Sequence, residues 1–366
     1  MKRRIRIGFY GSSLLSSYWN GAATYYRGLI RALAARGHEI TFFEPRAYQR
    51  QENADIEPPE WCEVVVFEPD EAGLASVLAE ARRFDVVIKT SGVGVLDTEL
   101  LEGVFASARP GALRLFLDVD APATQAEIAP DPTNPLRRLL PRLDFVLTYG
   151  GGPPVTSRYR ELGARECVAI YNALDPETHH PSDPDPRFRA DLGFLANRLP
   201  DREARVDAFF FDAARRLPQK TFLLGGNGWQ GASLPGNVRA IGHVPTRDHN
   251  AFNMTPRAVL NVARDSMAEV GFSPATRVFE AAGAGACLIT DAWKGIELFL
   301  KPDEEVLVAR DGADVAEHLR TLTPERARAI GRRALARIRA EHTYDRRAEQ
   351  LETLLVPALR TPEAVA

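Results

Sequence analysis

The sequence predicts an α/β protein of two domains, each built on a parallel β-sheet covered by helices. Short apolar segments alternate with helical segments along the chain, which is the pattern of strands joined by helical crossovers. At 366 residues the chain is also longer than a single hydrophobic core usually allows. Two such domains are therefore expected.

Strands are expected in the first half wherever a short apolar run is bounded by polar or turn residues. They cover residues 5–10, 39–45, 62–68, 84–90, 113–120, 145–150 and 167–172. Helices are expected between them, at residues 21–36 and from about residues 71 and 96 onward. Residues 173–188 are rich in Pro and Asp and lack periodicity, which indicates a linker.

The alternation restarts after this segment. Strands are expected at residues 192–196, 221–226, 238–244, 258–263, 287–291 and 305–310, and helices near 202–216 and 274–284. A final helical stretch from residue 324 places an apolar row on one face, namely Ala327, Ile330, Ala334 and Ile338.

These elements predict two Rossmann-like domains that face an interdomain cleft, where ligands of open parallel sheets bind. Residues 1–175 form the first domain and residues 187–341 the second. Residues 342–366 form a C-terminal helix that could pack back across both.

Composition excludes several classes of function. The formal net charge of −3 argues against nucleic-acid binding, and no segment is long and apolar enough to span a membrane. A cytoplasmic protein is expected, and a solvated face is preferred to peripheral membrane contact for the arginine-rich terminal helix. The scattered cysteines and histidines have no metal-ligand spacing, so buried thiols and no metal are expected.

The helix at residues 274–284 carries the most informative pair of charges. Ser273 suits its N-cap and Pro274 its first position. Arg277 and Glu280 lie one turn apart, away from the apolar face. An intrahelical salt bridge explains this pair, and so does a ligand that needs both groups.

Carboxylates end one predicted strand of the first domain. Asp118 and Asp120 lie on the same side of an extended segment. They could orient an acceptor hydroxyl, act as a general base, bind a cation or cap the following helix.

Further candidate binding residues follow other strands. Asn20 and Gly21 open the first long helix, where an anion or a sugar hydroxyl could bind, although an ordinary capped loop explains them too. Arg198 and Arg202 follow the first strand of the second domain and suit a diphosphate. The candidate set is completed by four residues at or just after the ends of later strands, namely Gly226, Asn227, His243 and Arg264.

Several motifs resemble those of CgeB-like glycosyltransferases, a group that includes the spore maturation protein of that name. The motifs are "LDVDAPAT", "LTYGGGPP", "YNALDP", "LGFLANRLPDRE", the segment from Arg257 to Asp311, and "EHTYDRRAEQLE". The resemblance covers nearly the whole chain and keeps the same order.

The resemblance implies a GT-B fold with the donor bound in the second domain. In related retaining enzymes a glutamate at the position of Glu280 grips the ribose, and a basic pair at the positions of Arg198 and Arg202 holds the diphosphate. Those relatives carry another glutamate where this chain has Phe272, and Glu269 is the nearest acid. This departure bears on sugar recognition and stereochemistry.

The expected activity is therefore hexosyl transfer from a nucleoside-diphosphate sugar, without a metal or other cofactor, and with retention. Ser273, Arg264 and Arg277 join Glu280 at the donor, and Asp120, with Asp118 behind it, faces the acceptor. The acceptor is a small molecule, a glycan or a protein. The alternatives are a non-catalytic nucleotide- or sugar-binding or spore-surface protein, and another two-domain enzyme such as a nucleotide-sugar epimerase.

Overall fold

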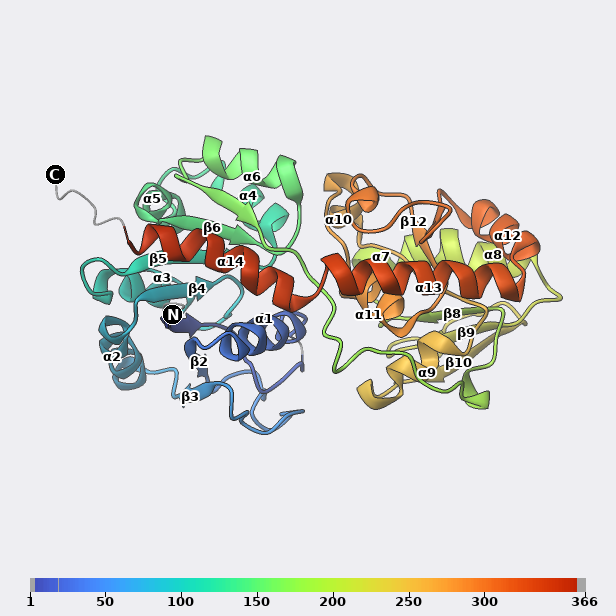
Figure 1. The fold of residues 1–366 in the computed structure, drawn as a ribbon, viewed down its shortest axis with the longest axis horizontal. Coiled ribbons are helices and arrows are strands. Elements are labelled where there is room, and N and C mark those ends of the chain that lie inside the picture. Colours follow the sequence, from blue (N-terminus) through green and yellow to red (C-terminus); the bar gives the residue numbers. More distant parts are fainter. Residues whose placement is uncertain (1–3, 19, 361–366) are drawn as a thin grey trace. The chain divides into compact units, whose positions relative to one another are not determined.

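The computed structural model describes residues 4–18 and 20–360, which fold into two α/β units (Figure 1). The first unit runs to Tyr171 and resumes at Tyr344, and the second is Asn172–Thr343. The segment between the predicted domains, residues 176–186, thus belongs to the second unit. Of the predicted C-terminal segment 342–366, the described part from Tyr344 onward belongs to the first unit, and residues 361–366 lie outside the described residues.

The first unit is built on a parallel sheet with the strand order β3-β2-β1-β4-β5-β6-β7. Its strands are β1 (Arg6–Tyr10), β2 (Glu39–Pro45), β3 (Glu63–Phe67), β4 (Val86–Thr90), β5 (Leu113–Asp118), β6 (Phe145–Thr148) and β7 (Cys167–Ala169). Its α-helices are α1 (Ala23–Ala35), α2 (Glu71–Glu80), α3 (Asp97–Ser107), α4 (Ala121–Ile128), α5 (Pro135–Leu139), α6 (Gly152–Glu161) and α14 (Tyr344–Ala358).

The second unit has its own parallel sheet, with the order β10-β9-β8-β11-β12-β13. Its strands are β8 (Leu192–Leu195), β9 (Phe222–Gly225), β10 (Val238–Gly242), β11 (Ala258–Asn261), β12 (Leu288–Asp291) and β13 (Leu307–Ala309). Its α-helices are α7 (Pro200–Val206), α8 (Asp212–Arg216), α9 (His249–Met254), α10 (Asp265–Val270), α11 (Thr276–Ala284), α12 (Gly312–Thr321) and α13 (Pro324–Glu341).

The predicted fold class is confirmed, because each predicted strand contains an observed one and both sheets are parallel. Central strands such as β4 and β8 are buried throughout, as expected where helices cover both faces. The predicted helix near 202–216 differs in detail. A π-helical turn at Asp207–Phe211 separates α7 from α8 and buries three consecutive phenylalanines, Phe209, Phe210 and Phe211.

The linker predicted for residues 173–188 instead packs onto the second unit. Leu174 and Phe188 are buried, and the Leu174 N–H donates to the His342 carbonyl over 2.8 Å. The Pro and Asp content of this segment predicted loop structure correctly but did not indicate that Leu174 and Phe188 are buried. The segment therefore has fixed contacts beside α11.

The helical stretch predicted from residue 324 is two helices. Residue His342 leaves the helical conformation, so α13 ends at Glu341 and α14 begins at Tyr344. The apolar row predicted on α13 is buried, which confirms it as core. In the first unit α14 lies beside α1, where the Tyr25 and Tyr344 rings meet edge to face at 6.0 Å (Figure 1). Within the described part of the chain, no helix combines the length and apolar content of a membrane span.

Candidate functional site

Polar residues of the second unit gather at the carboxyl ends of its strands. Loops after β8, β9 and β11 carry Arg198, Asn227 and Arg264, and β12 ends at Asp291. Parallel sheets bind ligands at this edge. Helix α11 adds Glu280 to the same set of candidates.

Helix α11 presents Glu280 and Arg277 from a well-packed base. Val278, Phe279, Ala281 and Ala282 are buried, and Gly285 ends the helix in the left-handed conformation. Arg277 Nη1 lies 3.2 Å from Glu280 Oε2, and both side chains are largely shielded from solvent. The salt bridge expected from the spacing of Arg277 and Glu280 is thus present, and it is largely shielded from solvent.

The predicted start of this helix is wrong by two residues. The N-cap is Ala275 rather than Ser273, and no side chain caps the helix. A contact from elsewhere constrains the residues before the helix, because the Phe272 N–H donates to the Lys294 carbonyl over 2.6 Å, and Ala275 is extended. Phe272 has a φ of 50°, in the left-handed region.

Two histidines that the sequence analysis left without a role reach Glu280. His179 Nε2 lies 4.0 Å from Glu280 Oε1, and the His179 and His249 rings are 6.2 Å apart. Gly283 makes this approach possible, because a Cβ there would lie 2.2 Å from Leu174 and 3.3 Å from the His179 carbonyl. The run of small residues in α11 was the one sequence signal of a close neighbour.

The charges around Glu280 keep it ionised. Burial alone would raise its pKa, but Arg277, His179, His249 and a hydrogen bond from Thr276 outweigh burial and hold the pKa of Glu280 at about 2. Burial, with repulsion from Arg277, lowers the pKa of His249 to about 4. At neutral pH the site therefore holds an anionic glutamate and a neutral His249.

These shifts predict acid destabilisation. Between pH 6.5 and about 4 the unfolded chain binds a proton at His249 that the folded chain does not. The free energy of unfolding therefore decreases as the pH is lowered through this range. The shift corresponds to roughly 3 kcal/mol. Urea unfolding at pH 7.5 and pH 5 is expected to show about 2 kcal/mol of this loss in the wild type and a smaller loss in His249→Gln. Equal losses in both proteins would contradict the assignment to His249.

A cluster of arginines lies at the start of α7. Burial lowers the pKa of Arg202, and repulsion from Arg264 and Arg277 lowers it further. Arg202 therefore lies close enough to both other guanidinium groups to be repelled by them. Arg264 pairs with Asp201, and Arg198 pairs with Glu203 and faces the Trp229 ring at 6.0 Å. Positive charge is thus concentrated at this edge.

Several buried polar atoms of this cluster have no hydrogen-bond partner among the described residues. They are Arg202 Nε, Arg277 Nε and Nη1, His179 Nε2 and His249 Nδ1. A buried donor without an acceptor costs about 1–3 kcal/mol, so a protein seldom leaves several in one place. Their grouping around Arg202 and Glu280 indicates a polar, anionic ligand.

An ion pair that sequence reasoning missed fixes α7. Arg205 Nη2 lies 2.5 Å from the buried Asp291 Oδ2, which also accepts from the Ala263 N–H over 3.1 Å. Arg205 Nε donates to the Ala263 carbonyl. This pair joins α7 to the ends of β11 and β12 and so positions Arg202.

The remaining donor-side candidates are a loop glycine and two exposed side chains. Asn227 and His243 are exposed, and the Asn227 N–H donates to Asn197 Oδ1 over 2.9 Å. Gly226 has a φ of 116°, and its N–H donates to the Gly242 carbonyl. A Cβ at Gly226 would lie 2.2 Å from the Ala196 carbonyl oxygen, so only glycine fits there.

Replacing Gly226 with alanine is therefore expected to destabilise the protein by about 3 kcal/mol or more, because backbone atoms must move. Gly231→Ala is the matched control: Gly231 also has a positive φ, 77°, but a Cβ there meets nothing within 4 Å. Its cost is expected to be about 1 kcal/mol. Urea unfolding measures both, and equal costs would contradict the steric argument.

In the first unit, the candidates lie after β1 and β5. Asn20 is buried, donates to the Ser13 and Ser16 carbonyls and accepts from Ser12 Oγ, so its side chain braces its own loop. It does not cap α1, which starts at Ala23. The Asn20 side chain is thus engaged within its own loop and its ligand role stays a prediction, while Gly21 is exposed with open space around it.

The two aspartates after β5 have different surroundings. Asp118 is buried and accepts from Ser91, Thr124, Tyr159 and the Asp120 N–H. Burial raises its pKa, although these donors oppose the shift. Asp118 thus holds the loop that presents Asp120, whose own side chain is exposed.

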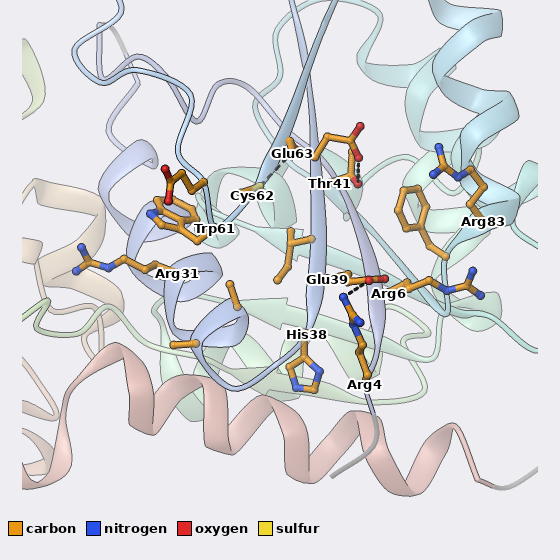
Figure 2. A pocket seen from close by; sticks show the side chains of 15 residues that line it. Arg4, Arg6, Arg31, His38, Glu39, Thr41, Trp61, Cys62, Glu63 and Arg83 are labelled. Atoms are coloured by element: carbon orange, nitrogen blue, oxygen red, sulfur yellow. Dashed lines mark hydrogen bonds and ion pairs between the residues drawn. The ribbon is translucent and has the colours of Figure 1, made fainter. Parts of the chain in front are cut away.

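A cavity of about 740 Å³ in the first unit lies at the opposite, amino ends of β1 to β3 (Figure 2). Of its four arginines, three pair with carboxylates: Arg4 with Glu39, Arg6 with Asp85 and Arg83 with Glu80. Most of the positive charge at this cavity is therefore already neutralised, which does not favour a diphosphate.

His179, His249 and Glu280 also form a group whose ligand atoms lie within 4.8 Å of one another. The sequence analysis expected no metal, and the histidine spacing gave no hint of this group. Arg277 lies against the same carboxylate and would oppose a divalent cation there. The surroundings favour hydroxyl donors on Glu280.

Comparisons with known proteins agree with this geometry. A family model described as "Glycosyl transferase-like" matches residues 202–353, which contain Arg202, Arg277 and Glu280. No curated protein matches the chain. The CgeB-like resemblance is narrower than the family match and stays a prediction.

Solved structures share the fold at low sequence identity. Sucrose-phosphate synthase from Thermosynechococcus elongatus is 14% identical with a TM-score of 0.72, over 98% of this chain and 100% of that one. HepE from Anabaena, solved with UDP-glucose, is 14% identical with a TM-score of 0.67, over 97% and 100%. T4 phage BGT, solved with its UDP-glucose substrate, is 12% identical with a TM-score of 0.61, over 96% and 99%. Residues 202–353 thus match a glycosyl transferase-like family model, and the likeness to the solved structures shows that the chain has the GT-B fold.

Proposed function

We propose that the protein transfers a hexosyl group from a nucleoside-diphosphate sugar to an acceptor hydroxyl. The observation that carries the proposal is the group of buried guanidinium atoms on Arg202 and Arg277 that make no hydrogen bond within the described residues, beside the ionised Glu280. A diphosphate would satisfy the arginines, and a ribose diol would satisfy the glutamate. UDP-glucose, which HepE and T4 phage BGT bind, has both groups.

The reaction places negative charge on the leaving diphosphate as the bond from the anomeric carbon to the phosphate oxygen breaks. Arg202, Arg264 and Arg277 would stabilise this charge from fixed positions, which is most effective where water is excluded. They supply the positive charge that a metal supplies elsewhere, so the transfer is proposed to be metal-independent. Glu280 would accept two hydrogen bonds from the ribose and fix the donor.

The acceptor oxygen forms the new bond to the anomeric carbon and loses its proton. With retention, which we propose, the leaving diphosphate takes that proton. With inversion, Asp120 would take it as general base. Asp118 would position Asp120 through the backbone hydrogen bond between them.

Isothermal titration with UDP, GDP and ADP tests donor binding, followed by product analysis with UDP-glucose, GDP-mannose and ADP-glucose in the presence of EDTA. Binding of one diphosphate and release of it from its sugar in EDTA are expected. If none of the three nucleotides binds, the proposal fails. Loss of turnover in EDTA, restored by a divalent metal, would instead assign a cation to His179, His249 and Glu280.

Under the proposed retention, replacing Asp120 with asparagine is expected to leave turnover and diphosphate affinity nearly unchanged, whereas a loss of turnover of about 10²- to 10⁴-fold would make the carboxylate the general base and indicate inversion. Release of UDP from UDP-glucose measures turnover, and titration measures affinity. Asp131→Asn, another exposed carboxylate of the first unit, is the control. Unchanged turnover in Asp120→Asn would remove Asp120 and leave the diphosphate as the proton acceptor.

A second candidate is a binding protein with this fold and no turnover. It is favoured by Phe272, which stands where related enzymes carry a glutamate and whose backbone is held in the left-handed region. It predicts nucleotide binding without release of any sugar. Product analysis with the three donors separates it from transfer.

A further inference from the structure

A second pocket, of about 540 Å³, lies in the first unit and is lined by Tyr18, Tyr48, Gln49, Arg50 and Gly94. These residues follow the carboxyl ends of three adjacent strands, β1, β2 and β4. Strand β5, the next in the sheet, ends beside Asp120. The pocket is therefore on the edge of the sheet that carries Asp120, and its size is typical of small-molecule sites.

Aromatic rings are concentrated at this pocket. In the described residues, large hydrophobic side chains with strong exposure are Tyr18 at 39%, Tyr48 at 54% and Leu298 at 49%, and both tyrosines line the pocket. The Tyr48 hydroxyl donates to the Gly94 carbonyl over 2.7 Å, so the ring is held in place while more than half of the side chain stays open to solvent. A fixed, exposed ring is a ready stacking surface.

A buried cation supports this ring. Arg50 is only 6% exposed, its guanidinium lies 5.0 Å from the Tyr48 ring centre, and it donates to the Ser12 and Val93 carbonyls over 3.1 Å. Within the described part of the chain the Arg50 Nε has no hydrogen-bond partner, although the buried Glu44 carboxylate acts on the guanidinium electrostatically. A buried guanidinium with an unsatisfied N–H favours electron-rich oxygen atoms nearby.

The loop that carries these residues is strained. Tyr48 and Gln49 are consecutive and have φ values of 57° and 54°, although neither is glycine. Each such residue costs about 1–3 kcal/mol, and such strain gathers at sites that need a particular side-chain direction. Here it presents Tyr48 and the Gln49 amide at the same pocket.

We propose that this pocket binds the acceptor and that the acceptor is a saccharide. A sugar ring has apolar C–H faces that stack on tyrosine and a polar edge whose hydroxyls can bond to Gln49 and to the hydroxyls of the tyrosines. A purely apolar acceptor would leave the Gln49 amide and the Arg50 Nε without hydrogen-bond partners. The inference rests on the proposed function, since an acceptor matters only if sugar is transferred.

Saturation-transfer difference NMR on the full chain tests the proposal, with maltose, cellobiose, methyl α-mannoside and the non-saccharide p-nitrophenol as probes. At least one saccharide is expected to receive saturation at its ring protons. Tyr48→Ala and Tyr18→Ala are expected to weaken its binding about five- to tenfold, whereas Tyr48→Phe, which keeps the ring, retains it. Leu298→Ala, the exposed side chain of the second unit, is the matched control and is expected to change nothing.

Titration of UDP with the same variants separates this proposal from the donor site. UDP binding without any saccharide signal, a signal that survives both alanine variants, or a signal from p-nitrophenol alone overturns the saccharide pocket and leaves the donor site standing. Saccharide binding that depends on the tyrosines, in a protein that binds no nucleotide, supports the pocket and overturns the proposed donor chemistry.

Discussion

Replacing Glu280 with glutamine is expected to weaken UDP binding about 10- to 100-fold, which corresponds to the 1.5–3 kcal/mol of one charge-assisted hydrogen bond. The carboxylate is ionised at neutral pH because its pKa is held at about 2, and it lies in a largely shielded place. Glutamine keeps the shape but donates from one of its two terminal atoms. Isothermal titration measures the change.

The 2′-deoxy nucleotide makes this test specific for the ribose. Wild type is expected to bind dUDP more weakly than UDP, because dUDP lacks the 2′-hydroxyl that donates to Glu280. Glu280→Gln should bind the two nucleotides with more similar affinities, because the carboxylate that accepts from this hydroxyl is already gone. Glu317→Gln, an exposed glutamate on α12 that pairs with Arg320, is the control. Equal discrimination by wild type and Glu280→Gln would place the ribose elsewhere.

Replacing Arg202 with methionine is expected to weaken UDP binding about 10- to 100-fold and to slow UDP release from UDP-glucose about 10²- to 10³-fold. The guanidinium is partly buried, its Nε has no partner among the described residues, and neighbouring arginines repel it. An incoming diphosphate would relieve both problems at once. Uridine, which lacks phosphate, should bind the variant and the wild type equally.

The same variant is expected to raise the stability of the ligand-free protein. Burial and repulsion from Arg264 and Arg277 make the charge of Arg202 unfavourable in the folded state, so its removal should shift urea unfolding to higher concentration. A purely structural arginine would give the opposite shift. Arg215→Met, on α8 and paired with Asp207 at the surface, serves as the control for both measurements.

Strand positions could be predicted because each strand is a short apolar run whose signal is local. Helix ends could not, since tertiary contacts moved them: Phe272 bonds to Lys294, so α11 starts after Ala275 rather than after Ser273. The break after α13 likewise depends on the contact of His342 with Leu174. Neither contact has a signal in the nearby sequence.

For the same reason, the surroundings of the candidate residues at strand ends could be predicted only in part. The sequence indicated Arg202, Arg277 and Glu280 as binding residues. In the structure Arg277 acts electrostatically on both Arg202 and Glu280. The sequence could not show that the donors around Asp118 leave its carboxylate occupied. The sequence also could not show that the Asn20 amide donates to carbonyl groups of its own loop.

By itself, the sequence determined two parallel sheets and the loops at their carboxyl ends, because hydrophobic periodicity and chain order act locally. Only the tertiary structure decided that His179 and His249 stand beside Glu280, and that Arg205 and Asp291 anchor α7. These contacts join residues far apart in the chain. They depend on close packing, such as the approach to Gly283, which no local pattern encodes.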